Sequence, residues 1–136
     1  MPRNVADLVK PPRPTQAEFQ TWTIECIAKF LVEARKTRYY TVFLIAIMTG
    51  MRREEVCALR WCDIDWENKR LKVCCAMVWK TGIGNTFEEP KTVKSRRDVA
   101  VDDHLLDELK RHKASQAKER LLLGMQYQDN DLINCN

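Results

Sequence analysis

One stretch of the sequence, TGMRREEVCALRWCDID at residues 49–65, joins an apolar segment to a short charged one. Gly50 predicts the end of the apolar helix, because glycine accepts the left-handed conformation that terminates helices. Arg52 or Arg53 then opens a short helix that runs to about Leu59. An arginine at that position stands beside free backbone N–H groups, where anions are favoured. The stretch therefore predicts an anion-binding helix start at Arg52.

Two helices are predicted before this stretch. The first begins after Thr23, a residue type that caps helix N-termini, and runs to about Arg35 with apolar residues on one face. The second runs from about Arg38 to Thr49. Residues 42–48 are all apolar, so this helix should be buried around its whole circumference.

Strand signals follow the quoted stretch. Residues 60–66 predict a turn that buries aromatic side chains, and a strand then begins at Leu71 and continues through Trp79. Further strands are expected at residues 86–88 and 98–101. The three strands predict a small antiparallel sheet.

A long helix is predicted next, capped by Asp102 or Asp103 and ended by Gly124 at about Leu123. Its inward residues should be Leu105, Leu106, Leu109 and Ala117. The order of elements predicts an α+β fold that is mainly helical, with a small three-stranded antiparallel sheet.

The predicted domain occupies residues 15–124. Residues 1–14 contain three prolines within positions 11–14 and are interpreted as an interdomain linker, which implies a further domain upstream. Residues 125–136 form a tail that is polar apart from Leu132 and Ile133, and we expect it to be partly ordered.

The composition, 45% hydrophobic and 31% charged over 136 residues, argues against a disordered chain. The longest apolar run is too short to span a bilayer, and no secretion signal precedes it, which favours a cytoplasmic protein without a membrane partner. The six cysteines include no C-x-x-C pair, so we interpret them as reduced thiols. Neither a metal nor a cofactor is predicted; a structural zinc is the alternative.

The net charge of +4 does not by itself indicate that the protein binds nucleic acid, but the distribution of the basic residues is more informative. Lys91, Lys94, Arg96 and Arg97 lie within seven residues that contain no acid. Such a cluster can contact phosphates. The alternative is an ordinary solvated turn.

Glu55 lies three residues after Arg52, on the same helical face, and could fix the orientation of the arginine. A simpler explanation is that acids in the first turn complement the helix dipole. That explanation accounts for Glu54 and Glu55 but not for the arginine, whose planar fork suits phosphate.

The pattern Thr-Gly-x-Arg-x-x-Glu, followed by Leu-x-Trp-x-Asp-Ile-Asp, resembles the first conserved box of tyrosine recombinases of the phage-integrase group. Residues 90–97, Pro-Lys-Thr-Val-Lys-Ser-Arg-Arg, resemble the β-hairpin segment of the same family at the expected distance. The similarity covers essentially the whole chain, as the N-terminal portion of the catalytic domain.

The resemblance implies roles for particular residues. Arg52 matches the first catalytic arginine, which stabilises charge on the scissile phosphate, and Glu55 matches the acidic residue that supports it. Lys91 matches the lysine that protonates the departing 5′-hydroxyl, with Lys94 as its nearest competitor. Lys94, Arg96 and Arg97 would be DNA-binding phosphate contacts.

The resemblance also implies double-stranded DNA as the partner, at attachment or inverted-repeat sites. The parent would be a tetramer on DNA, and this chain a monomer or weak dimer.

The chain departs from the family in three respects. It contains no His-x-x-Arg box and no tyrosine in the context of the nucleophile, and Glu54 replaces a residue that is usually small. A phosphotyrosine mechanism needs its nucleophile, so the chain by itself is expected to be inactive. Two alternatives stay open: a non-catalytic DNA-binding remnant of an integrase, and a globular protein unrelated to DNA.

Overall fold

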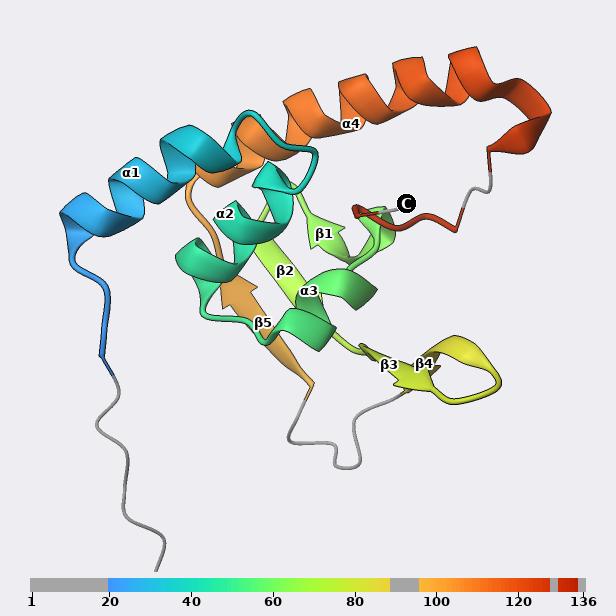
Figure 1. Cartoon of the computed structure of the whole chain (residues 1–136), viewed down its shortest axis with the longest axis horizontal. Coiled ribbons are helices and arrows are strands. Elements are labelled where there is room, and N and C mark those ends of the chain that lie inside the picture. Colours follow the sequence, from blue (N-terminus) through green and yellow to red (C-terminus); the bar gives the residue numbers. More distant parts are fainter. Residues whose placement is uncertain (1–19, 89–95, 128–129, 135–136) are drawn as a thin grey trace, which may run out of the picture.

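The first helix begins after Thr23 and the second ends at Gly50, as the capping residues predict, but the second helix begins at Tyr40, two residues after the predicted start at about Arg38. In the computed structural model, which describes residues 20–88, 96–127 and 130–134, helix α1 spans Ile24–Ala34 and helix α2 spans Tyr40–Thr49 (Figure 1). The Thr23 side chain accepts a hydrogen bond from the backbone N–H of Cys26. Gly50 ends α2 with a φ of 64°, the left-handed conformation that glycine adopts without strain.

Helix α2 is buried on one face only. Leu44 and Ile45 lie in the core, whereas Phe43, Ile47 and Met48 are each more than a third exposed. The expectation of burial around the whole circumference is therefore wrong for the described residues. Helices α1 and α3 and the first half of α4 pack against α2, and together they cover only part of its surface.

Helix α3 spans Arg53–Ala58 and is followed by a 3₁₀ turn at Trp61–Asp63. Val56 and Leu59 are buried, as predicted, and Trp61 is buried in the turn. The last residues of the predicted turn instead form a short strand, β1, at Ile64–Asp65.

The main sheet has the order β1-β2-β5, with β2 at Arg70–Val73 and β5 at Arg97–Ala100. Leu71 is its central residue, since it pairs with Ile64 on one side and with Val99 on the other. All pairs are antiparallel. The α+β class and the three-stranded antiparallel sheet are confirmed, although β1 was not among the predicted strands.

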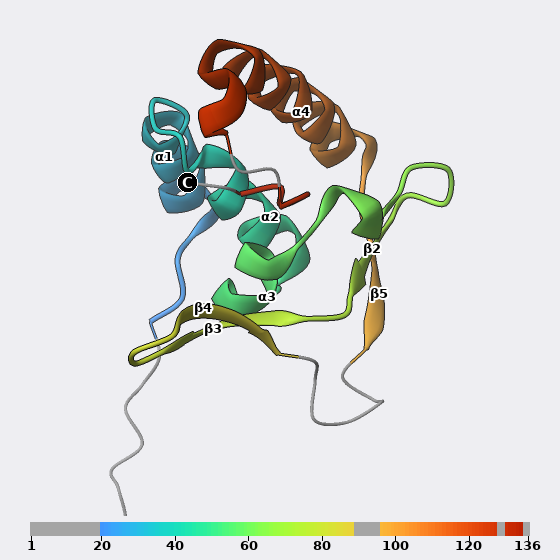
Figure 2. The ribbon, with the colours of Figure 1, turned by 90° about the vertical axis from the view of Figure 1, so that its right-hand side faces the viewer.

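The strand expected at residues 86–88 is not in the main sheet but in a separate, two-stranded ribbon. The strand expected from Leu71 through Trp79 is interrupted at Cys74 and Cys75, and the chain resumes as β3 (Ala76–Lys80), which pairs with β4 (Gly84–Glu88). Figure 2 shows the ribbon leaving the sheet and running beneath α3. Neither Cys74 nor Cys75 lies in a strand.

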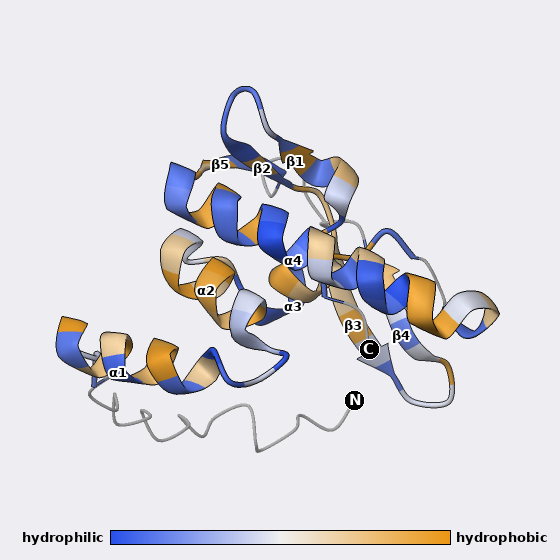
Figure 3. Ribbon diagram, turned by 90° about the horizontal axis from the view of Figure 1, so that it is seen from above, coloured by the Kyte–Doolittle hydropathy of each residue, from blue (hydrophilic) through white to orange (hydrophobic). Residues whose placement is uncertain are grey.

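Helix α4 spans Asp103–Leu123 and is capped by Asp102, whose carboxylate accepts the backbone N–H of Leu105 at 2.9 Å. Leu105, Leu106 and Leu109 are buried as predicted, but Ala117 is exposed. The second half of the helix extends past the other elements, and apolar residues face outward near its end (Figure 3). Ala117 lies on this extension, where no described residue covers it.

The C-terminal residues return to the core after a 3₁₀ turn at Gly124–Gln126. Leu132 pairs with Arg60 as an isolated β-bridge, and the backbone N–H of Ile133 donates to the carbonyl of Leu59 at 3.0 Å. Ile133 is fully buried among residues of α2, α3 and α4. Leu132 and Ile133 are therefore buried with the residues of the domain core.

Cys74 marks the interruption between β2 and β3. Its thiol donates to the Asp63 carboxylate at 3.3 Å. Burial, followed by this hydrogen bond, raises the pKa of Cys74 to about 11. The described cysteines, those at positions 26, 57, 62, 74 and 75, are free thiols.

Cys74 is expected to react with iodoacetamide on the order of 100-fold more slowly than an unperturbed cysteine at about pH 8, because only the thiolate is nucleophilic. Peptide mass spectrometry after timed quenching would give the rate for each cysteine. Labelling in urea serves as the control, since unfolding removes both the burial and the Asp63 contact. Equal rates for Cys74 in the folded and unfolded protein would contradict the prediction.

Within the described ranges, no helix has both the length and the apolar character needed to cross a membrane.

Candidate nucleic-acid interface

Arg52 precedes α3 as its N-cap residue, with extended backbone angles and an exposed side chain. Its backbone N–H donates to Oε2 of Glu55 at 2.8 Å. A glutamate that reaches back from the third helical position is half of a capping box, and it fixes the entry of the chain into the helix. The local sequence thus holds the backbone of Arg52 in one place.

The Glu55 carboxylate makes a second, longer-range contact. Its two oxygens accept parallel hydrogen bonds from the two terminal nitrogens of Arg97, at 2.8 and 2.9 Å. The Glu55 side chain is only 10% exposed, whereas that of Arg97 is 41% exposed. Glu55 therefore contacts Arg52 through the backbone, and the guanidinium that it pairs with belongs to Arg97.

This contact holds the pKa of Glu55 below its ordinary range. The hydrogen bonds from Arg97 are the largest cause, burial opposes them, and the Arg52 N–H lowers the pKa further. The same pairing raises the pKa of Arg97. Both groups are therefore charged at neutral pH, and the pair links the first residue of β5 to the first turn of α3.

Lowering the pH is expected to reduce the free energy of unfolding of the wild type more than that of a Glu55→Gln variant. The pKa of Glu55 is lower in the folded state than its unfolded value of about 4.3. Its contribution to stability is thus fully present above about pH 4.3 and is lost as the pH falls through the folded-state pKa. Urea unfolding between about pH 7 and pH 3 should show the stability difference between the two proteins shrinking; a constant difference would contradict this.

The basic segment is only partly described. Arg96 is exposed and immediately precedes β5, next to Arg97. Lys91 and Lys94 lie outside the described residues. The convergence of Lys91 with Arg52, and the phosphate contacts of Lys94, Arg96 and Arg97, stay predictions.

The pairing of Arg97 with Glu55 was not foreseen from the sequence. The two residues are 42 positions apart, and only the placement of β5 beside α3 brings them together. A cationic partner for Glu55 could have been expected from its place on a short, inward-facing helix, because a buried carboxylate requires a partner.

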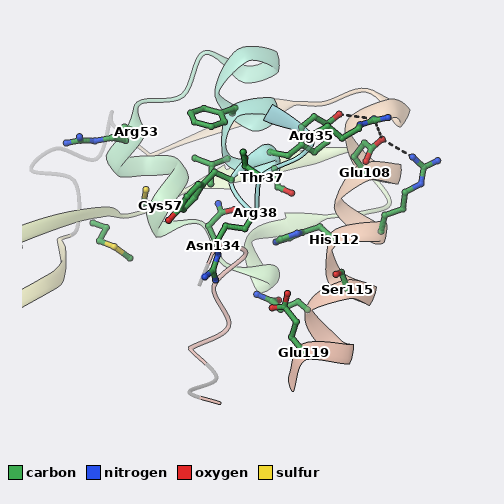
Figure 4. Close-up of a pocket in the computed structure, with 18 of the residues that line it drawn as sticks. Arg35, Thr37, Arg38, Arg53, Cys57, Glu108, His112, Ser115, Glu119 and Asn134 are labelled. Atoms are coloured by element: carbon green, nitrogen blue, oxygen red, sulfur yellow. Dashed lines mark hydrogen bonds and ion pairs between the residues drawn. The ribbon is translucent and has the colours of Figure 1, made fainter. Parts of the chain in front are cut away.

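A separate cleft of about 680 Å³ lies between α2 and α4 (Figure 4). Three of its charged groups pair with each other: Glu108 accepts from Arg35 and from Arg111, each at 2.8 Å. The lining includes Arg53 but not Arg52 or Glu55. Arg53 therefore lines this cleft and Arg52 does not, so the cleft is distinct from the predicted phosphate site.

Among the residues that the structure describes, no cluster of three or more histidine, cysteine, aspartate or glutamate side chains is arranged to hold a metal ion.

Comparison with known proteins matches residues 20–128 to the phage integrase family. A XerC-like tyrosine recombinase of Caldanaerobacter subterraneus is 35% identical over 125 residues, which is 86% of this chain and 32% of that protein. The ICEBs1 integrase of Bacillus subtilis is 31% identical over 133 residues, 96% of this chain and 36% of that protein. The chain thus spans about one third of the length of these relatives.

Solved structures show the same fold. The Tn1549 transposon integrase in complex with transposon right-end DNA superimposes with a TM-score of 0.67 at 23% identity, over 84% of this chain and 36% of that one. The XerA recombinase superimposes with a TM-score of 0.55 at 24% identity, over 96% of this chain and 39% of that one. The family match extends over most of the chain and includes the Arg52 box and the basic segment. The chain therefore belongs to the phage integrase family.

Proposed function

We propose that this chain is part of a site-specific DNA recombinase, which binds double-stranded DNA at attachment or inverted-repeat sites and rejoins strands through a phosphotyrosine intermediate. One observation carries the proposal. Arg52 is exposed at the start of α3, and its backbone is held by the buried Glu55 carboxylate, in a chain of the phage integrase family.

The chemistry assigned to Arg52 follows from its position. Cleavage of a phosphodiester builds negative charge on the non-bridging oxygens, and a guanidinium stabilises this charge through paired hydrogen bonds. The donor is effective only if it is held in place before the reaction, since reorganisation would consume its benefit. The capping contact from Glu55 supplies part of that preorganisation.

The basic segment supplies the remaining proposed contacts. Lys91 would protonate the departing 5′-hydroxyl, while Lys94 and Arg96 would contact phosphates without reading bases. The solved Tn1549 integrase, which shares the fold, is in complex with DNA, and this supports DNA as the partner. We further propose a cytoplasmic protein, a tetrameric parent on DNA, and a monomer or weak dimer for this chain.

Fluorescence anisotropy with a labelled duplex tests DNA binding. Phosphate contacts by Arg52, Lys91, Lys94 and Arg96 predict that log Kobs falls with log salt with a slope of roughly −3.6. The affinity should therefore drop on the order of 100-fold or more between about 50 and 200 mM salt. Absence of binding at the lower salt concentration would contradict the proposal.

The second candidate function is a non-catalytic DNA-binding remnant. It is favoured by Glu54, which adds a negative charge between Arg52 and Glu55 where the family usually has a small residue. Covalent trapping on nicked attachment DNA, compared between this chain and its full-length parent, separates the two. We expect DNA binding without trapping by this chain alone. Trapping by the parent supports the recombinase, and its absence from the parent supports the remnant.

A further inference from the structure

Arg97 belongs to the basic segment, yet its guanidinium is paired with a carboxylate. Two of its nitrogens are engaged by the Glu55 carboxylate in a parallel, two-point contact. The same carboxylate accepts the backbone N–H of Arg52. Hydrogen bonds thus connect Arg97, the first residue of β5, through the buried Glu55 carboxylate to Arg52, the N-cap residue of α3.

We infer that Arg97 is a positioning residue for Arg52, acting through Glu55 rather than by contacting a DNA phosphate. The part of this inference that concerns DNA rests on the proposed function. The part that concerns the position of Arg52 rests on the contacts alone.

The geometry favours this role over a phosphate contact. A phosphate that approached the paired edge of Arg97 would have to displace a carboxylate that already makes two charge-assisted hydrogen bonds. The pair also carries no net charge, so it adds little attraction for DNA. Without Arg97, Glu55 would be a largely buried carboxylate that keeps only the Arg52 N–H as its described hydrogen-bond donor.

The two roles respond differently to lysine. A phosphate contact tolerates lysine, because an ammonium is also an effective phosphate ligand. A planar two-point contact does not, since lysine presents a single point charge and cannot make the parallel pair. Arg97→Lys is therefore the informative variant, and Arg97→Gln removes the charge as well.

The first test follows the backbone amide of Arg52 by NMR during a pH titration. The charged groups that face Glu55 are Arg97 and Arg52, so the Arg52 amide reports the ionisation of the carboxylate that it binds. In the wild type the midpoint should lie below about 4.3, and in Arg97→Gln it should rise toward or above that value. Arg96→Gln, the adjacent control, should leave the midpoint unchanged. An equal midpoint in the wild type and Arg97→Gln would overturn the inference.

The second test compares DNA affinities at low salt. Arg97→Gln is expected to weaken binding on the order of 10-fold, and Arg97→Lys should stay closer to Arg97→Gln than to the wild type. At position 96 the lysine variant should instead recover most of the affinity that Arg96→Gln loses, as expected of a phosphate contact. Near-wild-type affinity of Arg97→Lys would assign Arg97 to the phosphates and overturn the inference. If the wild type itself does not bind DNA, the proposed function fails, and the Arg52 amide alone decides whether Arg97 positions it.

Discussion

Replacing Ile133 with alanine is expected to lower the free energy of unfolding by about 2–5 kcal/mol, although only three residues follow it in the sequence. Its side chain is 0% exposed and packs within the core cluster. Truncation removes apolar contacts and leaves a cavity that the surrounding side chains fill only in part. A loss of this size is large relative to the stability of a typical domain.

Leu122→Ala provides the matched control, because Leu122 is 86% exposed near the end of α4. Its replacement should change the stability by no more than about 0.5 kcal/mol. Urea unfolding followed by tryptophan fluorescence measures both variants. Similar small effects at the two positions would show that residues 130–134 do not complete the core.

Replacing Arg52 with glutamine is expected to weaken DNA binding roughly 10- to 100-fold at low salt, the range for the loss of hydrogen bonds to a charged group. The slope of log Kobs against log salt should also become shallower by about 0.9, which corresponds to one phosphate contact. Anisotropy titrations over a series of salt concentrations give both quantities.

Arg53→Gln is the control for this prediction, since it makes the same change of charge one residue away. Arg53 forms an ion pair with Glu54 at 3.0 Å and lines the cleft between α2 and α4. Its replacement should leave the salt slope close to that of the wild type. Equal losses for the two variants would mean that general charge, and not the position of Arg52, governs binding.

Local chemistry was enough to predict the start of α1, the end of α2 and the start of α4 to within one residue. Thr23, Gly50 and Asp102 each act through their own backbone or through a residue at most four positions away, so their effect can be inferred from the sequence alone. The sequence offered Asp102 or Asp103 as the cap of the long helix, and the structure has Asp102 in that position.

Packing between distant segments limited the rest. An apolar face indicates that a helix favours burial, but it does not identify the covering segment. This is why exposed Ala117 and the exposed side of α2 were not predicted. The continuous strand signal across Cys74 and Cys75 likewise concealed the departure of the ribbon from the sheet, because strand propensity does not specify the pairing partner.

The candidate site shows the same division. The three-residue spacing of Arg52 and Glu55 predicted their proximity, and a backbone hydrogen bond joins them. The partner of the carboxylate, Arg97, comes from another element and could not be selected from among several basic residues by spacing alone.

The location of bound DNA tests whether Arg52 lies on the DNA-binding surface. Titrating a short duplex into isotope-labelled protein and following the backbone amides by NMR maps the contacted surface. We expect the largest chemical-shift changes at residues 52–55 and 96–97. Changes confined to α1 or to the end of α4, with the amide of Arg52 unaffected, would contradict it.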